Sequence, residues 1–293
     1  MRVHLIDGTY ELFRHFYGGP PPPPGAPRNA VAGVARSLLG LLEGGATHLG
    51  VATDHVIESF RNELYDGYKT GEGIDPALFA QFVPLEEGLV AMGIVVWPMI
   101  EVEADDALAA AAVCAADDPR VEQVLLCSPD KDLAQCVRGD RVVQLDRRAG
   151  TVRNEDGVKA AFGVPPASIP DYLALVGDTA DGYPGLPGWG PSSAAALLAR
   201  YRRIEEIPES ASAWEVRLRG AERLAETLRT RREEALLYRT LAVLRTDQPR
   251  ILVDELEYRG PKPEFEALAA GWGRPEWFER SRALAASRAS GGG

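Results

Sequence analysis

Acidic residues recur in this chain where apolar runs end and where helices are predicted to begin. Asp7, Asp54 and Asp130 each follow a run of apolar residues. The full set is Asp7, Asp54, Glu103, Asp105, Asp106, Asp130, Asp132, Asp178 and Asp181. Carboxylates at this density repel one another, so the fold must place a neutralising group among them.

Predicted strands and helices alternate through the first half of the chain. Strands are predicted over Val3–Asp7, His48–Thr53, Gly93–Trp97 and Val121–Cys127, helices over Ala30–Leu42, Leu78–Met92 and Ala104–Ala116, and a hairpin over Arg141–Leu145 and Thr151–Arg153. This alternation predicts an α/β fold with a mostly parallel sheet flanked by helices. Sites in such sheets form at the carboxyl ends of the strands. We therefore expect Asp7, Asp54 and Asp130 to share one site.

A hard divalent cation is the expected neutralising group. Mg²⁺ takes carboxylate and water oxygens, and two such ions a few ångströms apart can cleave a phosphodiester. Acids in the first turn of a helix can instead serve the helix dipole, which explains one or two of Glu103, Asp105 and Asp106 but not all three. Asp105 and Asp106 point about 100° apart on a helix, so they are expected to serve different ions or to act through water.

Two further acidic pairs have spacings that allow convergence on a cation. Asp130 and Asp132 share a face of an extended segment. Asp178 and Asp181, three residues apart, share a face of a helix or turn. Each pair taken alone could equally be a solvated turn.

The composition fits one large domain or two modest ones. The 293 residues are 45% hydrophobic, which supports a substantial core. No apolar run reaches 18 residues and no secretory signal is visible, so we expect a cytoplasmic protein without membrane association. The cysteines and histidines lack metal-ligand spacing, and the cysteines are expected to be reduced core thiols.

The charge balance taken as a whole argues against nucleic-acid binding, because the formal net charge is −11. The charges are unevenly distributed, however. Residues 1–195 hold 14 basic and 27 acidic side chains, whereas residues 196–250 hold 12 basic and 9 acidic. An acidic protein whose charges serve only solubility remains an alternative.

The second half changes to a helical pattern. Helices are predicted over Asp171–Val176, Ser192–Arg203, Trp214–Leu228 and Glu233–Leu244. We expect an α/β domain over 1–168, a helical region over 169–287 and a disordered tail over 288–293. The run Pro20–Pro24 predicts an extended polyproline segment.

A glycine-rich segment, Pro184–Pro191, lies between two predicted helices. Its glycines let the backbone approach a phosphate closely, and the helix that begins near Ser192 offers free N–H groups. The alternative is a loop without function.

The acidic groups also occur in a distinctive order: IDGTYELFR, VATD, SFRNELYDGYK, EADD, SPDKDL and DYLALVGDTADGYPGLPGWG. Together these segments resemble the bacterial and phage 5′-nuclease family. That family includes the N-terminal nuclease domain of DNA polymerase I, stand-alone 5′–3′ exonucleases and flap endonucleases. The resemblance runs from about Val3 to about Arg250, and the blocks keep their order and spacing throughout.

The resemblance implies a PIN-like catalytic domain followed by a helix-hairpin-helix region that grips DNA. It implies a monomeric 5′–3′ exonuclease or flap endonuclease, dependent on Mg²⁺ or Mn²⁺, that acts in replication or repair on DNA with a 5′ flap, a nick or a free 5′ end. One ion is expected at Asp7, Asp54, Glu103 and Asp105, and a second at Asp130, Asp132, Asp178 and Asp181, with Asp106 completing the cluster. A K⁺ site is expected at the glycine-rich hairpin.

The resemblance also implies roles for basic, aromatic and glycine residues. Arg14 and Lys69 are expected to neutralise charge on the phosphate, and Tyr17 to stack on a base. Arg61 and Tyr68 match the arch through which single-stranded 5′ ends pass. The expected duplex contacts are Gly185, Gly188, Gly190 and Ser192.

The chain departs from the family pattern at three places. A lysine usual after the hairpin is missing from Pro191–Ala194, an asparagine usual after the last carboxylate is Gly182, and a basic residue usual after Lys69 is Glu72. These changes predict a weaker or differently arranged grip on DNA. Two alternatives stay open, a non-catalytic protein that binds branched DNA and a PIN-like ribonuclease. The nine carboxylates favour catalysis over the first, and the glycine-rich hairpin weighs against the second.

Overall fold

The computed structural model describes residues 1–19 and 29–291, so the predicted polyproline segment at Pro20–Pro24 lies outside the described residues. The chain divides into two compact units. The sheet unit comprises Met1–Ile57, Gly71–Cys127 and Thr246–Gly293, and the helical unit comprises Glu58–Thr70 and Ser128–Arg245.

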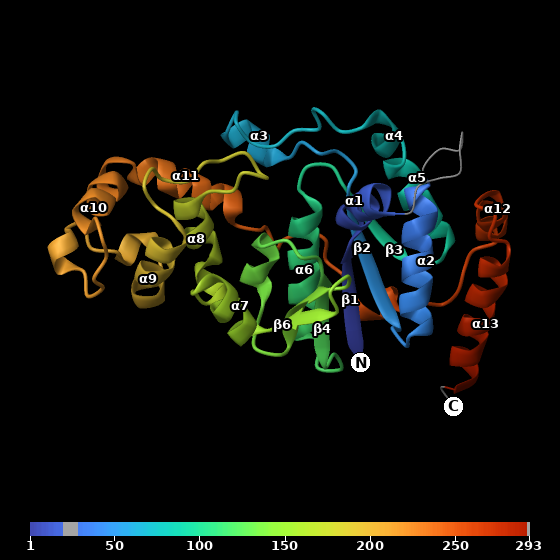
Figure 1. Cartoon of the computed structure of the whole chain (residues 1–293). Coiled ribbons are helices and arrows are strands. Elements are labelled where there is room, and N and C mark those ends of the chain that lie inside the picture. The colour runs from blue at the N-terminus through green and yellow to red at the C-terminus, as the bar shows by residue number, and fades with distance from the viewer. Residues whose placement is uncertain (20–28, 292–293) are drawn as a thin grey trace. The chain divides into compact units, whose positions relative to one another are not determined.

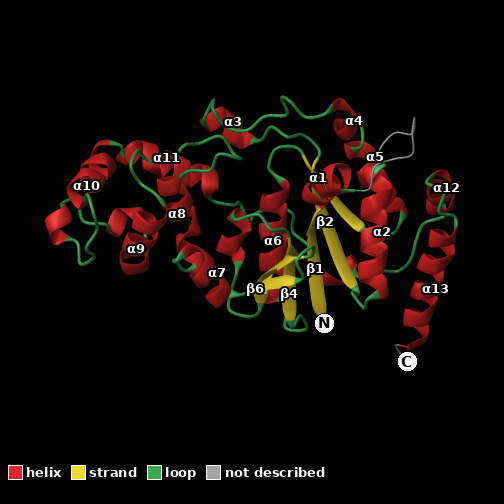
Figure 2. Ribbon diagram, viewed as in Figure 1, coloured by secondary structure: helices red, strands yellow, loops and turns green. Residues whose placement is uncertain are grey.

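The sheet unit is built from alternating strands and helices. Its elements are β1 (Arg2–Asp7), α1 (Gly8–Gly18), α2 (Ala30–Glu43), β2 (His48–Asp54), α4 (Pro76–Phe79), α5 (Phe82–Ala91), β3 (Val95–Met99), α6 (Ala104–Asp117), β4 (Gln123–Cys127), a short 3₁₀ turn η5 (Val253–Leu256), α12 (Glu264–Gly271) and α13 (Glu276–Gly291). The strands of this unit lie side by side in the order β3-β2-β1-β4 and all pair in parallel (Figure 2). The predicted α/β class and mostly parallel sheet are confirmed.

Helices cover both faces of these strands because parallel neighbours are joined by right-handed crossovers. The connections through α2 and α5 run toward β3, whereas the connection through α6 runs back to β4, so α6 covers the opposite face (Figure 1). The strands are accordingly apolar on both sides, with Val3, Leu5 and Ile6 fully buried. All the alanines of α6 except Ala116 are also buried, and their small side chains let this helix lie close against the sheet.

The helical unit contains the remaining elements. They are α3 (Phe60–Leu64), η1 (Asp132–Cys136), β5 (Val142–Asp146), β6 (Thr151–Arg153), α7 (Glu155–Phe162), η2 (Pro166–Ser168), α8 (Ile169–Val176), α9 (Pro191–Tyr201), η3 (Ile204–Glu206), η4 (Ala211–Ala213), α10 (Ala221–Thr230) and α11 (Arg232–Ala242). The predicted hairpin is present, with β5 and β6 antiparallel. Helix α8 packs against α9 and α11 around an apolar core that includes Tyr183, which stacks on Tyr238 with ring centroids 5.5 Å apart.

Several predicted elements differ from the structure, each for a local reason. The single helix predicted over Leu78–Met92 is two helices, because Pro84 has no N–H to continue a helix from α4 and is tolerated only in the first turn of α5. The third strand begins at Val95 rather than Gly93, because Gly93 adopts a positive φ of 88° where the chain leaves α5.

The helix predicted over Trp214–Leu228 is wrong for its first half. Gly220 adopts a positive φ of 72° and α10 begins only after it, while Nε1 of Trp214 donates to the carbonyl of Pro208 (2.7 Å) in the preceding irregular segment. The tail prediction is wrong for residues 288–291, which continue α13. There Nη2 of Arg288 donates to the carbonyls of Leu42 (2.6 Å) and Ala46 (2.8 Å). Helices α1, α3, α7, α12 and α13 were not predicted.

No helix among the described residues combines the length and the apolar character needed to cross a membrane.

Candidate metal centre

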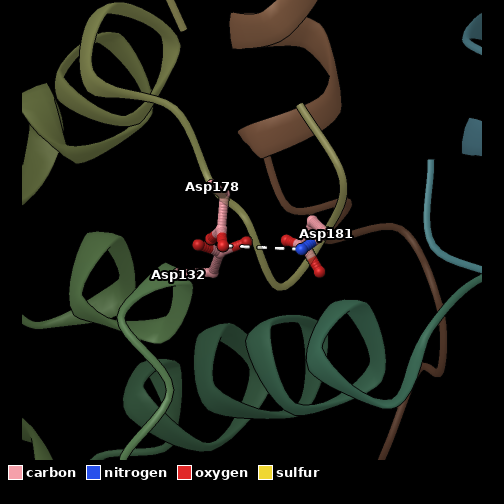
Figure 3. A group of neighbouring side chains, drawn as sticks. All are labelled: Asp132, Asp178 and Asp181. Atoms are coloured by element: carbon pink, nitrogen blue, oxygen red, sulfur yellow. Dashed lines mark hydrogen bonds between the residues drawn. The ribbon is translucent and has the colours of Figure 1, made fainter. Parts of the chain in front are cut away.

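Three carboxylates of the helical unit converge on one point. Asp132, Asp178 and Asp181 each offer an oxygen atom, and these atoms lie within 4.8 Å of one another (Figure 3). All three residues are buried, with 2–8% of their surface exposed. Asp132 begins η1, and the other two lie in the loop between α8 and α9. The structure therefore brings together three of the four acids expected at the second ion.

The loop that carries Asp178 and Asp181 is held by its own backbone. The N–H of Asp178 donates to the carbonyl of Tyr183 (2.8 Å), and the N–H of Tyr183 donates back to Asp178 (3.0 Å). Oδ1 of Asp178 accepts from the N–H of Ala180 (3.0 Å). Gly182 has a positive φ of 92°, and a Cβ there would collide with the carbonyl of Gly67. Glycine at position 182 therefore permits a backbone approach that a larger residue would obstruct.

Two lysines of the same unit neutralise part of the cluster. Nζ of Lys131 lies 2.7 Å from Oδ2 of Asp178, and Nζ of Lys69 lies 2.9 Å from Oδ1 of Asp181. The N–H of Lys69 also donates to the carbonyl of Asp181 (2.9 Å), which fixes this lysine beside the loop. Lys69 thus lies beside the carboxylates, as its predicted role requires. Lys131 was not predicted to have a role, and its position between two acids was the only signal in the sequence.

The electrostatics of Asp132 indicate a site built for a cation. Burial raises the pKa of Asp132 well above its usual range, and the charges of Asp130, Asp181 and Asp178 raise it further. Its Oδ1 atom is buried and has no hydrogen-bond partner among the described residues. Burial alone would lower the pKa of Lys131, but its hydrogen bond to Asp178 and the nearby carboxylates outweigh burial and raise the pKa. An orphaned oxygen among buried carboxylates fits a hard divalent cation, which takes oxygen ligands.

Asp130 lies apart from this close group. Its side chain is exposed, and its Oδ1 atom accepts from the N–H of Asp132 (2.9 Å). Its own N–H donates to Oγ of Ser128 (3.2 Å). In this conformation Asp130 shapes the turn that presents Asp132.

The remaining predicted acids lie in the sheet unit, at the carboxyl ends of adjacent strands and at the start of α6. Asp7 ends β1, where it caps α1 by accepting from the N–H of Tyr10 (2.8 Å). Asp54 ends β2, and its Oδ1 atom accepts from the N–H of Ala104 (2.8 Å), which places this carboxylate at the start of α6. These contacts agree with the expected position of a site at the carboxyl edge of the sheet.

The acids around the start of α6 differ in their burial and in their hydrogen bonds. Asp106 is fully buried, and its Oδ2 atom accepts from the N–H of Glu103 (2.9 Å), so it stabilises the first turn of the helix. Glu103 is 5% exposed and Asp105 is partly exposed. Asp106 therefore has a structural function that the sequence did not indicate, and its predicted role beside the ions stays a prediction.

The residues predicted to contact single-stranded DNA have mixed outcomes. Arg61 is 1% exposed and donates through Nε to the carbonyl of Leu241 (2.7 Å) and through Nη2 to that of Val243 (3.1 Å). Tyr68 is 3% exposed and belongs to the apolar core of the helical unit. Both side chains stabilise the unit from within, and their burial speaks against the predicted DNA contacts.

Two predicted residues of α1 differ in their availability. Tyr17 is 62% exposed and packs edge-on against Phe16 with ring centroids 5.1 Å apart, so a base could stack on it. Arg14 forms an ion pair with the buried carboxylate of Glu11 and a contact of 3.1 Å with Nε2 of His15. Its guanidinium group is therefore already engaged on α1.

The predicted hairpin joins α8 to α9. The N–H of Leu186 donates to the carbonyl of Leu175 (2.9 Å), and Gly190 caps α9 with extended backbone. Gly185 and Gly188 have positive φ values of 69° and 82°. Ser192 is exposed in the first turn of α9.

An arginine from α10 lies against this hairpin. A Cβ at Gly188 would be 3.1 Å from Nη2 and 3.7 Å from Cζ of Arg223, so the absence of a side chain at Gly188 makes room for the guanidinium group. Arg223 is exposed and forms no ion pair within the described part of the chain. The sequence did not indicate this contact, because the two residues are far apart in the chain.

Two family models match the chain. The N-terminal resolvase-like domain of 5′-3′ exonucleases matches residues 2–163, and their C-terminal SAM fold matches residues 164–264. The chain belongs to the 5′–3′ exonuclease family. The resemblance inferred from the sequence motifs is confirmed, and so is the helical character of the second half.

Individual relatives agree with this membership. A 5′-3′ exonuclease of Aquifex aeolicus is 32% identical over 91% of this chain and 89% of its own length. DNA polymerase I of Pseudomonas aeruginosa is 36% identical over 91% of this chain, but the match covers only 29% of that protein. The chain therefore spans less than a third of the length of that polymerase. The flap endonuclease of bacteriophage T5, solved in a complex with DNA and metal ions, shares the fold with a TM-score of 0.66 at 16% identity, over 97% of this chain and 98% of its own.

Proposed function

We propose that this chain is a divalent-metal-dependent 5′ nuclease that hydrolyses phosphodiesters in DNA carrying a 5′ flap, a nick or a free 5′ end. The observation that carries the proposal is the buried cluster of Asp132, Asp178 and Asp181 with its orphaned Oδ1 atom. A buried group of like charges costs stability, so its presence in a member of this family favours a catalytic use.

The residues that would hold the ions fall into two sets. We assign one Mg²⁺ or Mn²⁺ ion to Asp7, Asp54, Glu103 and Asp105. We assign the second ion to Asp130, Asp132, Asp178 and Asp181. Asp106 would act through its support of Glu103. When bound, such ions lower the pKa of water and neutralise charge on the scissile phosphate.

Other residues would orient the substrate. Lys69 lies beside the carboxylates and is suited to neutralise the phosphate, and Arg14 would do so after leaving Glu11. Tyr17 is exposed and would stack on a base at the 5′ end. In this proposal these three residues orient the substrate, and the carboxylates hold the cations.

The hairpin would bind the duplex part of the substrate. Gly188, Gly190 and Ser192 would present exposed or partly exposed backbone to a phosphate, whereas Gly185 is buried and would shape the turn. K⁺ could be held at the carbonyls of this segment. Arg223 would supply the positive charge that is absent from Pro191–Ala194. We assign catalysis to residues 1–168 together with Asp178 and Asp181, and duplex binding to residues 169–287.

A monomer in the cytoplasm that acts in replication or repair fits this proposal. The T5 flap endonuclease was solved with DNA and metal ions, and a DNA polymerase I is among the relatives. Both agree with a DNA substrate for this chain.

The test is a panel of 5′-labelled substrates incubated with the purified chain in Mg²⁺, in Mn²⁺ and in EDTA. Flap DNA, nicked duplex and an RNA–DNA hybrid separate the possible activities. We expect cleavage of flap or nicked DNA only when a metal is present. Tight binding of flap DNA without cleavage would indicate the non-catalytic alternative, and cleavage confined to RNA would indicate the ribonuclease.

A further inference from the structure

Lys131 is the closest cation to the buried carboxylate of Asp178. Its Nζ atom lies 2.7 Å from Oδ2, and its side chain is 35% exposed whereas that of Asp178 is 3% exposed. Lys131 therefore reaches from the protein surface into the cluster. Its ammonium group occupies one of the directions from which another cation would approach Asp178.

The other oxygen of Asp178 is already used by the loop. Oδ1 accepts from the N–H groups of Ala180 (3.0 Å) and Asp181 (3.4 Å), which fixes the orientation of the carboxylate. Oδ2 is thus the atom that Asp178 can offer to a metal ion without breaking its own loop. That atom is the one bound by Lys131.

We propose that Lys131 is a positioning residue of the metal centre: its ammonium group holds Asp178 in place before a metal binds, and it leaves Asp178 when a divalent cation enters. The inference rests on the proposed function, because it assumes that the cluster binds metal. It adds a residue and an exchange step to that function.

The exchange follows from the short distances. An Mg²⁺ ligand distance is about 2.1 Å, so an ion on Oδ2 of Asp178 would lie within about 4.8 Å of a lysine that kept its contact of 2.7 Å. Two cations at this separation among buried side chains repel strongly. Lys131 has a flexible stem and partial exposure, so it can move toward solvent, whereas Asp178 cannot.

When no metal is present, Lys131 stabilises the carboxylate cluster instead of repelling a bound ion. Asp132, Asp178 and Asp181 lie within 4.8 Å of one another and are buried. Lys131 and Lys69 then provide positive charges in direct contact with Asp178 and Asp181. Removing Lys131 should destabilise the metal-free protein and strengthen metal binding at the same time.

The test compares Mn²⁺ binding by the wild type, by Lys131→Met and by a control, Lys159→Met. The substitution Lys159→Met removes the same charge from the same unit. Lys159 pairs with Glu155 on the protein surface, with Nζ 3.0 Å from Oε1. Free Mn²⁺ is measured by electron paramagnetic resonance, and the melting temperature is measured with and without the ion. We expect Lys131→Met to bind Mn²⁺ roughly tenfold more tightly, since the repulsion between the lysine and the ion is removed. Without metal, this variant should melt at a lower temperature than the wild type. Its melting temperature should rise more than that of the wild type when Mn²⁺ is added. Lys159→Met should match the wild type.

A second measurement on the wild type follows the lysine itself. The rate of acetylation of Lys131 by a water-soluble ester, read by mass spectrometry, should rise several-fold when Mn²⁺ saturates the protein, because its ion pair is broken. The rate at Lys159 should stay constant.

The outcomes separate this inference from the function on which it rests. If the wild type binds no Mn²⁺, the metal centre itself is refuted, and the inference with it. If Mn²⁺ binds but Lys131→Met leaves the affinity unchanged, or Lys131 stays equally protected from acetylation, the exchange is refuted while the metal centre stands. Should Lys131→Met fail to fold, the acetylation measurement still decides.

Discussion

Two aspartates that are two residues apart differ sharply in their surroundings. Asp130 is exposed and accepts a backbone hydrogen bond, whereas Asp132 is 5% exposed among other carboxylates. The pKa of Asp132 is raised by burial and by the charges of Asp130, Asp181 and Asp178. Burial among like charges therefore disfavours the charged form of Asp132.

This difference predicts the effect of neutral substitutions in EDTA. Asp132→Asn should be more stable than the wild type, and the gap should widen with pH. The unfolded chain releases the proton of Asp132 near pH 3.8, the ordinary pKa of an aspartate, whereas the folded protein keeps it to higher pH. Within that window the wild type loses about 1.4 kcal/mol of stability for each pH unit, until the folded form also ionises. Urea unfolding at several pH values measures this.

Asp156→Asn is the matched control, since its side chain is 92% exposed on α7 and its charge is not among those that raise the pKa of Asp132. It should follow the wild type across the pH range. Equal stability of Asp132→Asn and the wild type at every pH would show that Asp132 carries no electrostatic cost.

Sequence spacing predicted that Asp178 and Asp181 could converge, the family resemblance added Asp130 and Asp132 at the same ion, and the structure brings Asp132, Asp178 and Asp181 together. The partners of those acids could not be predicted in the same way. Arg61 lies in a polar segment and was expected to face DNA, yet it is buried against carbonyls about 180 residues further along the chain. Such a contact depends on tertiary packing, which leaves no local periodicity to detect.

At the scale of elements, the hairpin between α8 and α9 depends on close backbone approach. Gly185 has a positive φ of 69°, and a Cβ there would collide with backbone atoms of Val176 and Gly177. Gly190 is different, because its φ is −151° and nothing lies within 4 Å of a Cβ built there. The backbone conformation and the packing therefore require glycine at position 185 but not at position 190.

Gly185→Ala should consequently destabilise the protein by about 2–4 kcal/mol, through left-handed backbone strain and overpacking. Gly190→Ala should cost less than about 1 kcal/mol, the size of a lost helix-cap preference. Chemical denaturation of both variants decides between the two glycines. A Gly185→Ala variant as stable as Gly190→Ala would mean that the hairpin is not packed as described.

The same hairpin predicts one phosphate contact from α10. Arg223→Gln should reduce the slope of log affinity against log salt by about 0.9 for duplex DNA measured in Ca²⁺, which is the loss of one contact. Arg229→Gln is the control, since Arg229 lies on the same helix but pairs with Glu226. Equal slopes for Arg223→Gln and the wild type would remove Arg223 from the DNA-binding surface.

Elements with strong patterns were predictable from the sequence, and those that depend on single residues were less so. The buried strands β1, β2 and β4 and the alanine-rich α6 appear within two residues of their predicted bounds. The split between α4 and α5 depends on Pro84, and the late start of α10 depends on Gly220. The effect of each residue depends on its position relative to the first turn of the helix. Helix α1 escaped prediction because Asp7 both ends a strand and caps the helix that follows it directly.

For the whole molecule, the net charge of −11 is a poor guide to partners. Nine of the acids belong to the predicted ion-binding sets, and three of them form a buried cluster that already contains two lysines. The family membership, established over residues 2–264, indicates a nuclease despite that charge. The location of acids within the fold is therefore more informative than their number.

The central claim is that the carboxylate cluster makes this chain a metal-dependent nuclease. The most direct measurement is the initial rate at which flap DNA is cleaved in saturating Mg²⁺ by the wild type, by Asp132→Asn and by Asp156→Asn. Asp156 is a control with the same change of charge, since its side chain is 92% exposed on α7. We predict cleavage by the wild type and by Asp156→Asn, none in EDTA, and a loss of at least a hundredfold, about 2.7 kcal/mol of activation free energy, in Asp132→Asn. Cleavage by Asp132→Asn at the wild-type rate, or cleavage that persists in EDTA, would contradict the account.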